Sequence, residues 1–221
     1  MNLFLVRHGE SLGNVRGGYW GRTDVPLTER GEQQAAEAAR QLAAFLTPLP
    51  TATPSGQGKS RKPLVLYASP LQRAVRTAEI IAEHLRMALS LSDADGDIRI
   101  EIMSELSEID FGDWEQLHYE EIAERFPEAC QAWQEDWAHF TYPHGEGFQE
   151  FLARVQRGWQ RICAERLEAG MADGSCILVA HGGTLKALRL IAEHRPTEDF
   201  WRISLPVGGV QMVHISDVLP L

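Results

Sequence analysis

The chain has 221 residues, of which 44% are hydrophobic and 24% are charged. This length is typical of one domain, and the composition argues against a disordered, collagen-like or coiled-coil chain. No apolar run approaches the ~18 residues that a membrane-spanning helix needs. The chain starts with a strand-like run and has no basic leader, so we expect a cytoplasmic protein with one domain over residues 1–221.

The formal net charge of −10 is unevenly distributed along the chain. Residues 93–150 contain 17 acidic and two basic residues, whereas the remainder contains 14 acidic and 19 basic residues. Because no basic stripe could neutralise a nucleic-acid backbone, we expect no nucleic-acid partner. An anion site in the basic remainder stays open. The three widely spaced cysteines, Cys130, Cys163 and Cys176, predict buried thiols in a reducing compartment.

Short apolar runs alternate with helical patterns along the chain. In the first half we expect a strand at 2–6, a helix with Thr28 as N-cap that ends near Leu46, and a strand at 64–68. A helix follows with Ser69 as N-cap and Pro70 as its first residue, and then a weaker strand at 98–103. In the second half we expect two short helices within 118–142, a helix at about 146–167, a strand at 176–180, a helix at 184–192, and closing strands at about 202–205 and 210–215. This alternation predicts an α/β three-layer sandwich, with a mostly parallel sheet flanked by helices.

Two segments are predicted to be insertions in this fold. Ten of the 16 residues at 47–62 are Pro, Gly, Ser or Thr, which indicates a flexible surface segment. Residues 117–145 are acidic and aromatic, and we expect them to form a helical cap over the ligand site. Trp133 and Trp137 are four residues apart there, so core packing is the simplest interpretation and stacking on a substrate is the alternative.

Two predicted strands end in the same pattern of Val, one residue, His and Gly. The first strand leads to Arg7 and His8, and a later strand leads to His181. Arg73 lies in the first turns of the helix after a third strand. Because ligands of open parallel sheets bind beyond the carboxyl ends of the strands, we expect these four side chains at one site.

These residue types suit a phosphate ester. Two guanidinium groups can hold phosphate oxygens with forked hydrogen bonds, and their charge keeps a histidine between them neutral and able to act as a nucleophile. The proton donor for the leaving oxygen would then be a carboxylate from residues 105–115. The residues alone do not decide among the candidates Glu105, Glu108, Asp110, Asp113 and Glu115.

Four motifs, spread in order over nearly the whole chain, resemble those of the histidine phosphatase (phosphoglycerate mutase-like) superfamily. They are Leu5-Val6-Arg7-His8-Gly9-Glu10-Ser11 with Asn14, Ser69-Pro70-Leu71-Gln72-Arg73-Ala74 with Thr77-Ala78, Leu106-Ser107-Glu108 with Phe111-Gly112-Asp113-Trp114-Glu115, and Val179-Ala180-His181-Gly182-Gly183. Within the superfamily, the stretches 21–28, 111–115, 132–137 and 145–155 resemble the α-ribazole phosphatases of cobalamin biosynthesis.

The resemblance implies a role for each matched residue. His8 would be the phosphorylated nucleophile and Glu108 the acid and then the base. Arg7, Arg73 and His181 would hold the phosphoryl group, while Asn14, Thr23 and Gly182 would contact phosphate or substrate. We expect no cofactor and no metal, because arginines and histidines supply the positive charge, and because Asp136, His139 and His144 fit no usual ligand spacing.

The predicted function is hydrolysis of a small-molecule phosphate monoester through phosphohistidine, with α-ribazole 5′-phosphate as substrate. The alternatives are a broad-specificity phosphatase, a mutase or sugar bisphosphatase on the same fold, and a non-catalytic phosphoprotein-binding module. The acidic cap has one base, Arg125, and so disfavours substrates with a second strong negative charge. The sequence does not decide the physiological substrate, the phosphorylated nitrogen of His8 or the oligomeric state, for which a homodimer is open.

Overall fold

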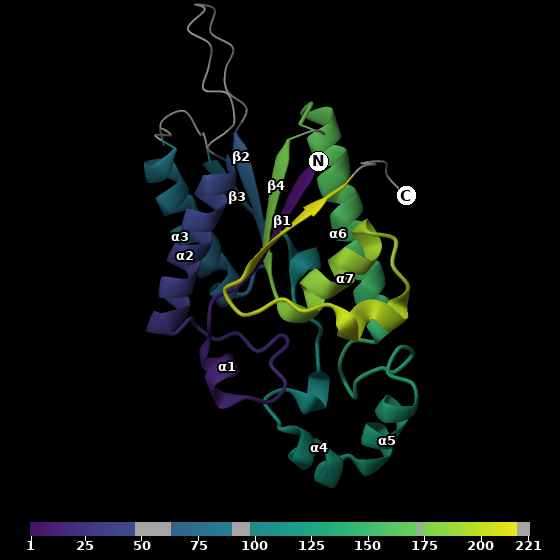
Figure 1. The fold of residues 1–221 in the computed structure, drawn as a ribbon. Coiled ribbons are helices and arrows are strands. Elements are labelled where there is room, and N and C mark those ends of the chain that lie inside the picture. The colour runs from purple at the N-terminus through teal and green to yellow at the C-terminus, as the bar shows by residue number, and fades with distance from the viewer. Residues whose placement is uncertain (47–62, 90–97, 172–173, 216–221) are drawn as a thin grey trace, which may run out of the picture.

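The computed structural model describes residues 1–46, 63–89, 98–171 and 174–215. A five-stranded sheet in the order β3-β2-β4-β1-β5 lies at its centre (Figure 1). The strands are β1 (Asn2–Arg7), β2 (Leu64–Ala68), β3 (Ile98–Ile102), β4 (Ser175–Ala180) and β5 (Val210–His214). Neighbouring strands pair in parallel, except that β5 runs antiparallel to β1. The predicted α/β class with a mostly parallel sheet is confirmed.

Helices cover both faces of the sheet and form the two outer layers (Figure 1). Helices α2 (Glu29–Leu46) and α3 (Gln72–Ala88) pack on one face, and α6 (Phe148–Glu168) and α7 (Gly182–Ala192) on the other. The alternation of side chains along a strand explains why both faces are apolar. In β1, Leu3 and Leu5 belong to the core beneath α6 and α7, while Phe4 and Val6 belong to the core beneath α2 and α3.

Short elements gather at the carboxyl edge of the sheet, at the bottom of Figure 1. They are α1 (Leu12–Arg16), α4 (Tyr119–Arg125), α5 (Pro127–Glu135) and the 3-10 turns Ser104–Leu106, Gly112–Trp114 and Thr197–Arg202. The two helices expected within 118–142 are therefore present, and they lie beyond the edge where the predicted site residues emerge. None of the helices in the described ranges is long and apolar enough to span a membrane.

Two local predictions were wrong. Helix α3 starts at Gln72, not at Pro70, because the Ser69 hydroxyl is engaged by His181 and accepts only a 3.3 Å hydrogen bond from the Leu71 N–H. The strand expected at 202–205 is the end of a 3-10 turn followed by irregular chain. Ile203 and Leu205 are buried there, so a loop that packs into the core produced the same apolar pattern as a strand. The insertion at 47–62 lies outside the described residues.

Candidate active site

Strands β1 and β4 place two histidines side by side. The parallel register pairs Arg7 with Ala180, so the next residue on each strand, His8 and His181, emerges at the same level of the edge. Their ring centroids are 5.0 Å apart, and the residues are only 4% and 1% exposed. Arg73, in the first turn of α3, donates from Nε to Nδ1 of His181 at 3.2 Å. The structure thus brings together the residues that the strand-end pattern predicted.

His8 is held in a single tautomer. Its Nδ1 lies 2.7 Å from the carbonyl oxygen of Gly9, which can only accept, so Nδ1 carries the proton and Nε2 keeps its lone pair. Burial, and then the charges of Arg73 and Arg7, lower the pKa of His8 to about 3, against the raising effect of the Gly9 contact. The imidazole is therefore neutral at physiological pH.

His181 has the opposite tautomer. Because the Nε group of Arg73 can only donate, Nδ1 of His181 must accept, and Nε2 carries the proton. That proton is donated to the Ser69 hydroxyl oxygen at 2.6 Å. Burial, followed by the charges of Arg73, His8 and Arg7, lowers the pKa of His181 well below its ordinary value. A phosphoryl oxygen would compete with Ser69 for this N–H.

The Arg73 guanidinium is fixed by backbone carbonyls. It donates from Nη1 to the Thr23 carbonyl at 3.0 Å and from Nη2 to the Gly21 carbonyl at 2.7 Å. The loop that supplies these carbonyls is itself held by Glu115, whose carboxylate accepts from the N–H groups of residues 21, 22 and 23. These two N–H groups and the one that Nε donates to His181 make three of five, so within the described residues Arg73 keeps one unused N–H on each terminal nitrogen.

Arg7 is less completely satisfied. Its Nη1 donates to the Leu205 carbonyl at 2.8 Å, but its buried Nε finds no partner within the described part of the chain. Gly182, the first residue of α7, lies against this guanidinium, since a Cβ there would come within 3.1 Å of the Arg7 Cζ. Burial lowers the pKa of both Arg7 and Arg73, while Glu108 opposes the shift. Two desolvated guanidinium groups with unused donors form a site for an anion.

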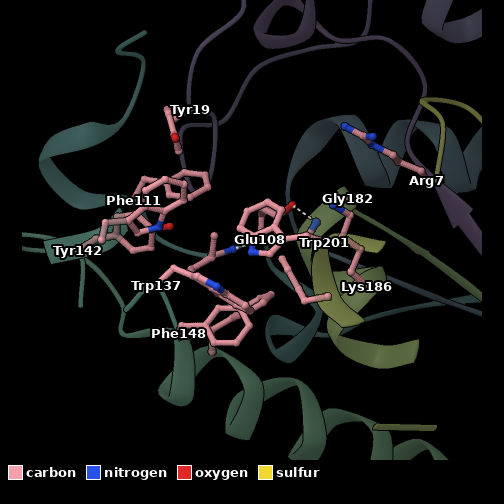
Figure 2. A pocket seen from close by; sticks show the side chains of 15 residues that line it. Arg7, Tyr19, Glu108, Phe111, Trp137, Tyr142, Phe148, Gly182, Lys186 and Trp201 are labelled. Atoms are coloured by element: carbon pink, nitrogen blue, oxygen red, sulfur yellow. Dashed lines mark hydrogen bonds between the residues drawn. The ribbon is translucent and has the colours of Figure 1, made fainter. Parts of the chain in front are cut away.

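Glu108 is buried at the start of α7. Its Oε2 accepts from the Gly183 N–H at 2.8 Å, and its Oε1 accepts from the Thr184 N–H at 3.0 Å, the Thr184 hydroxyl at 3.1 Å and the Ile109 N–H at 3.1 Å. Helix N-termini favour negative charge, so these donors hold the carboxylate in one orientation. Figure 2 shows Glu108 between the Gly182 side of the pocket and the aromatic side.

The other four candidate carboxylates have different partners. Glu105 faces Arg161, Asp110 accepts from the Gly112 N–H, Asp113 pairs with the exposed His144, and Glu115 holds residues 21–23. Among the five, Glu108 is the one whose carboxylate is bound at the start of α7, directly after His181, and whose charge acts on both Arg7 and Arg73, as the motif spacing implied.

Arg154 on α6 positions the Glu108 loop, a role that the sequence did not reveal. It forms a two-point ion pair with Glu146, with both N···O distances at 2.7 Å. Its remaining N–H groups donate to the carbonyls of Glu105, Ser107 and Glu108 at 2.8–3.3 Å. The only sequence signal for Arg154 was its place in the stretch 145–155 that resembles the α-ribazole phosphatases.

The remaining predicted contacts fall in different places. Thr23 reaches the site through its backbone carbonyl, and Gly182 through its packing on Arg7. Asn14 is exposed, and its Oδ1 accepts from the Ser11 N–H at 3.0 Å, which caps α1. The structure thus gives the Asn14 side chain a helix-capping contact.

A cavity of about 340 Å³ opens beside Arg7 and Glu108 (Figure 2). Its walls are aromatic: Tyr19, Phe111, Trp133, Trp137, Tyr142, Phe148, Phe200 and Trp201. Trp133 and Trp137 also pack on other rings, Trp137 at 4.8 Å from Phe148. Trp133 and Trp137 thus pack against other aromatic side chains and also line the cavity. Phe200 and Trp201 were not predicted here, because they come from a 3-10 turn distant in sequence from the cap.

Two histidines of the cap, His139 and His144, each pair with one carboxylate. His139 contacts Asp136 at 2.9 Å, and His144 contacts Asp113 at 2.9 Å, with all four side chains well exposed. Within residues 1–46, 63–89, 98–171 and 174–215, no three His, Cys, Asp or Glu side chains are grouped so that they could hold a metal ion.

Comparison with known proteins agrees with this geometry. The sequence profile of the Histidine phosphatase superfamily (branch 1) matches residues 3–218. Proteins named adenosylcobalamin/alpha-ribazole phosphatase from Escherichia coli (strain K12) and Salmonella typhimurium are 31% and 32% identical, over 98% of this chain and 91–92% of theirs. The crystal structure of the alpha-ribazole phosphatase from Shigella flexneri superposes with a TM-score of 0.74 at 32% identity, covering 99% of this chain and 92% of that one. The prediction of an enzyme of the phosphatase class is confirmed, and the chain belongs to the histidine phosphatase superfamily.

Proposed function

We propose that the protein hydrolyses α-ribazole 5′-phosphate, a ribose phosphate that carries a neutral aromatic base, through a phosphohistidine at His8. The observation that carries this proposal is the aromatic cavity next to Arg7 and Glu108. A phosphate held by the arginines would leave the rest of the ester in that cavity. The relatives from Escherichia coli, Salmonella typhimurium and Shigella flexneri bear the name of the same substrate.

In the first step, the lone pair on Nε2 of His8 attacks phosphorus in line with the ester bond. The P–N bond forms, the P–O ester bond breaks, and the electron pair stays on the leaving oxygen, which takes a proton from Glu108. Arg7, Arg73 and the N–H of His181 stabilise the charge on the other three oxygens. The neutral state of His8 supports this role, because a protonated Nε2 has no lone pair to attack with.

In the second step, water attacks the phosphohistidine. Glu108, now deprotonated, takes a proton from the water while the P–N bond breaks and its electron pair returns to Nε2. Inorganic phosphate leaves, and His8 is neutral again, with the N–H of Nδ1 still donating a hydrogen bond to the Gly9 carbonyl. The protein's own cations supply the charge at each stage, so the proposal requires no added metal.

The cavity suits an aromatic leaving group. Stacking of a base on aromatic side chains is worth about 1–3 kcal/mol per base. For the single base of α-ribazole 5′-phosphate, this corresponds to a kcat/KM about 5- to 150-fold higher than for an alkyl phosphate of similar charge. The acid excess in the cap adds repulsion against substrates with a second anionic group.

The test is a panel of phosphomonoesters assayed with chelator present: p-nitrophenyl phosphate, glycerol phosphate, phosphoglycerate and α-ribazole 5′-phosphate. We expect turnover without metal, the highest kcat/KM for α-ribazole 5′-phosphate, and loss of turnover in His8→Ala. Glu108→Gln should slow hydrolysis of alkyl esters, whereas Glu105→Gln, in the same loop but facing Arg161, should not. Equal kcat/KM across the panel would favour a broad-specificity phosphatase, and unchanged turnover in His8→Ala would refute the mechanism.

A further inference from the structure

The described part of the chain contains one lysine, Lys186, and it lines the aromatic cavity. The side chain extends from α7 and is half-buried. Its Nζ lies 5.1 Å from the ring centroid of Trp201 and 5.3 Å from that of Phe200. These distances are within the range of cation–π attraction, so the two rings hold the ammonium group at the cavity wall.

No carboxylate neutralises this ammonium group within the described ranges. Its Nζ makes neither a hydrogen bond nor an ion pair there, and its contacts are the two ring faces. Burial, and then the charge of Arg7, lowers the pKa of Lys186, while Glu108 has the opposite effect. An ammonium group has three N–H donors, and ring faces satisfy them poorly, so they are available to a molecule in the cavity.

The position of Lys186 along α7 indicates which part of a substrate it meets. Gly182, which lies against Arg7, is four residues earlier, so the two residues share a helix face and are about 6 Å apart along the helix axis. In Figure 2, Lys186 lies next to Gly182 and across Glu108 from Phe111 and Tyr142. Arg7, Glu108 and Lys186 line the same cavity, so with phosphate on Arg7 and the leaving oxygen at Glu108, the first ring of the leaving group would lie beside Lys186.

We propose that Lys186 determines leaving-group specificity by donating hydrogen bonds to the ring hydroxyls of a pentose 5′-phosphate. This proposal rests on the proposed function, because it assumes a ribosyl substrate, and it adds the residue that reads the sugar. Hydroxyl oxygens are favoured over a second anionic group because Glu108 borders the same cavity and the cap carries excess negative charge. A neutral sugar also leaves the contacts of Lys186 with Phe200 and Trp201 in place.

The test compares substrates that differ only in these hydroxyls: adenosine 5′-monophosphate and its 2′,3′-dideoxy analogue. Both are measured by kcat/KM and as inhibitors of p-nitrophenyl phosphate hydrolysis, in wild type and in Lys186→Met. A hydrogen bond from a charged donor corresponds to a preference of about 10-fold or more. We expect wild type to prefer the ribonucleotide by this factor and Lys186→Met to lose the preference, with kcat/KM for the ribonucleotide falling more than kcat/KM for p-nitrophenyl phosphate.

Arg189→Met is the matched control. It removes one positive charge from the same helix, but Arg189 pairs with Glu193 outside the cavity, so the preference should persist. The proposal is overturned if wild type does not distinguish the two nucleotides in either assay, or if Lys186→Met retains the preference for the ribonucleotide. It is overturned too if Lys186→Met slows hydrolysis of p-nitrophenyl phosphate as much as hydrolysis of the ribonucleotide. It is also overturned if Lys186→Met instead loses a preference for phosphoglycerate. If the hydroxyl preference behaves as expected while α-ribazole 5′-phosphate is not the best substrate, only the proposed substrate fails.

Discussion

Replacing Gly183 with alanine tests whether the orientation of Glu108 matters for catalysis. A Cβ at residue 183 would come within 2.6 Å of Oε1 and 3.1 Å of Cδ of Glu108. Ordinary contact starts near 3.4 Å, so the carboxylate would have to move by about 0.8 Å. That shift would break or lengthen the hydrogen bond from the Gly183 N–H and displace the proton donor from the leaving oxygen.

The expected loss is large for activity and small for stability. A misplacement of about 1 Å costs on the order of 100-fold in rate, so we expect Gly183→Ala to lower kcat for alkyl phosphates by 10- to 100-fold. Loss of the hydrogen bond to the buried Glu108 costs about 1–3 kcal/mol. Gly183 has no positive φ, and alanine is favoured over glycine in helices by up to about 1 kcal/mol, so the free energy of unfolding should fall by no more than about 2 kcal/mol. p-Nitrophenyl phosphate, whose leaving group needs less proton donation, should be affected less.

The assay is steady-state hydrolysis of both ester types alongside urea denaturation. Gly182→Ala is the neighbouring control, because its Cβ would meet the Arg7 Cζ at 3.1 Å and leave Glu108 untouched. We expect that variant to change KM more than kcat, since Arg7 binds the phosphate in both ground and transition states. A stably folded Gly183→Ala with wild-type kcat for alkyl esters would refute the assignment of Glu108 as proton donor.

Three further predictions concern buried polar contacts. Ser69→Ala removes the acceptor of the buried His181 N–H and should lower the free energy of unfolding by about 1–3 kcal/mol in urea titrations; an unchanged value would contradict the 2.6 Å hydrogen bond. Arg154→Met removes the two-point partner of Glu146, which is only 13% exposed and keeps a 3.8 Å contact with Arg22, and should cost about 3 kcal/mol. Arg161 is 46% exposed, so Arg161→Met should cost at most about 1 kcal/mol. The pKa of His8 is about 3 in the folded chain and 6.5 as the ordinary value, so between these pH values the unfolded state binds the extra proton. His8 therefore does not reduce the free energy of unfolding above pH 6.5, but lowers it by about 1.4 kcal/mol per pH unit as the pH falls from 6.5 towards 3. The free energy of unfolding of His8→Asn should fall less steeply than that of wild type between pH 6 and 4, and equal slopes would contradict this reasoning.

The convergence of the candidate site residues could be predicted because the carboxyl ends of parallel strands lie at one edge of the sheet. His8 and His181 each end a buried strand, and parallel pairing of β1 with β4 is enough to bring them together. Arg73 needed only one more strand and the start of its helix. Glu108 lies in a loop, where no hydrophobic periodicity indicates which way a side chain points. The residue types therefore left five carboxylates as candidates for the proton donor, and the motif resemblance chose among them.

The leaving-group side could not be predicted in the same way. Phe200 and Trp201 join the cavity because the turn Thr197–Arg202 folds against α7, and no local signal fixes where a 3-10 turn packs. The same stretch produced the wrong strand at 202–205, since burial of Ile203 and Leu205 imitates strand hydrophobicity. Arg154 was missed because its partners are mostly backbone carbonyls, which carry no sequence identity.

The aromatic cavity also has an optical consequence. The chain has six tryptophans, and three of them, Trp133, Trp137 and Trp201, line this one cavity. Indole emission depends on the polarity around the ring, and Trp201 is 54% exposed. An aromatic ligand that displaces water from the cavity therefore changes the intrinsic fluorescence of half the tryptophans at once. In a His8→Ala background, binding could be followed directly, without label and without turnover.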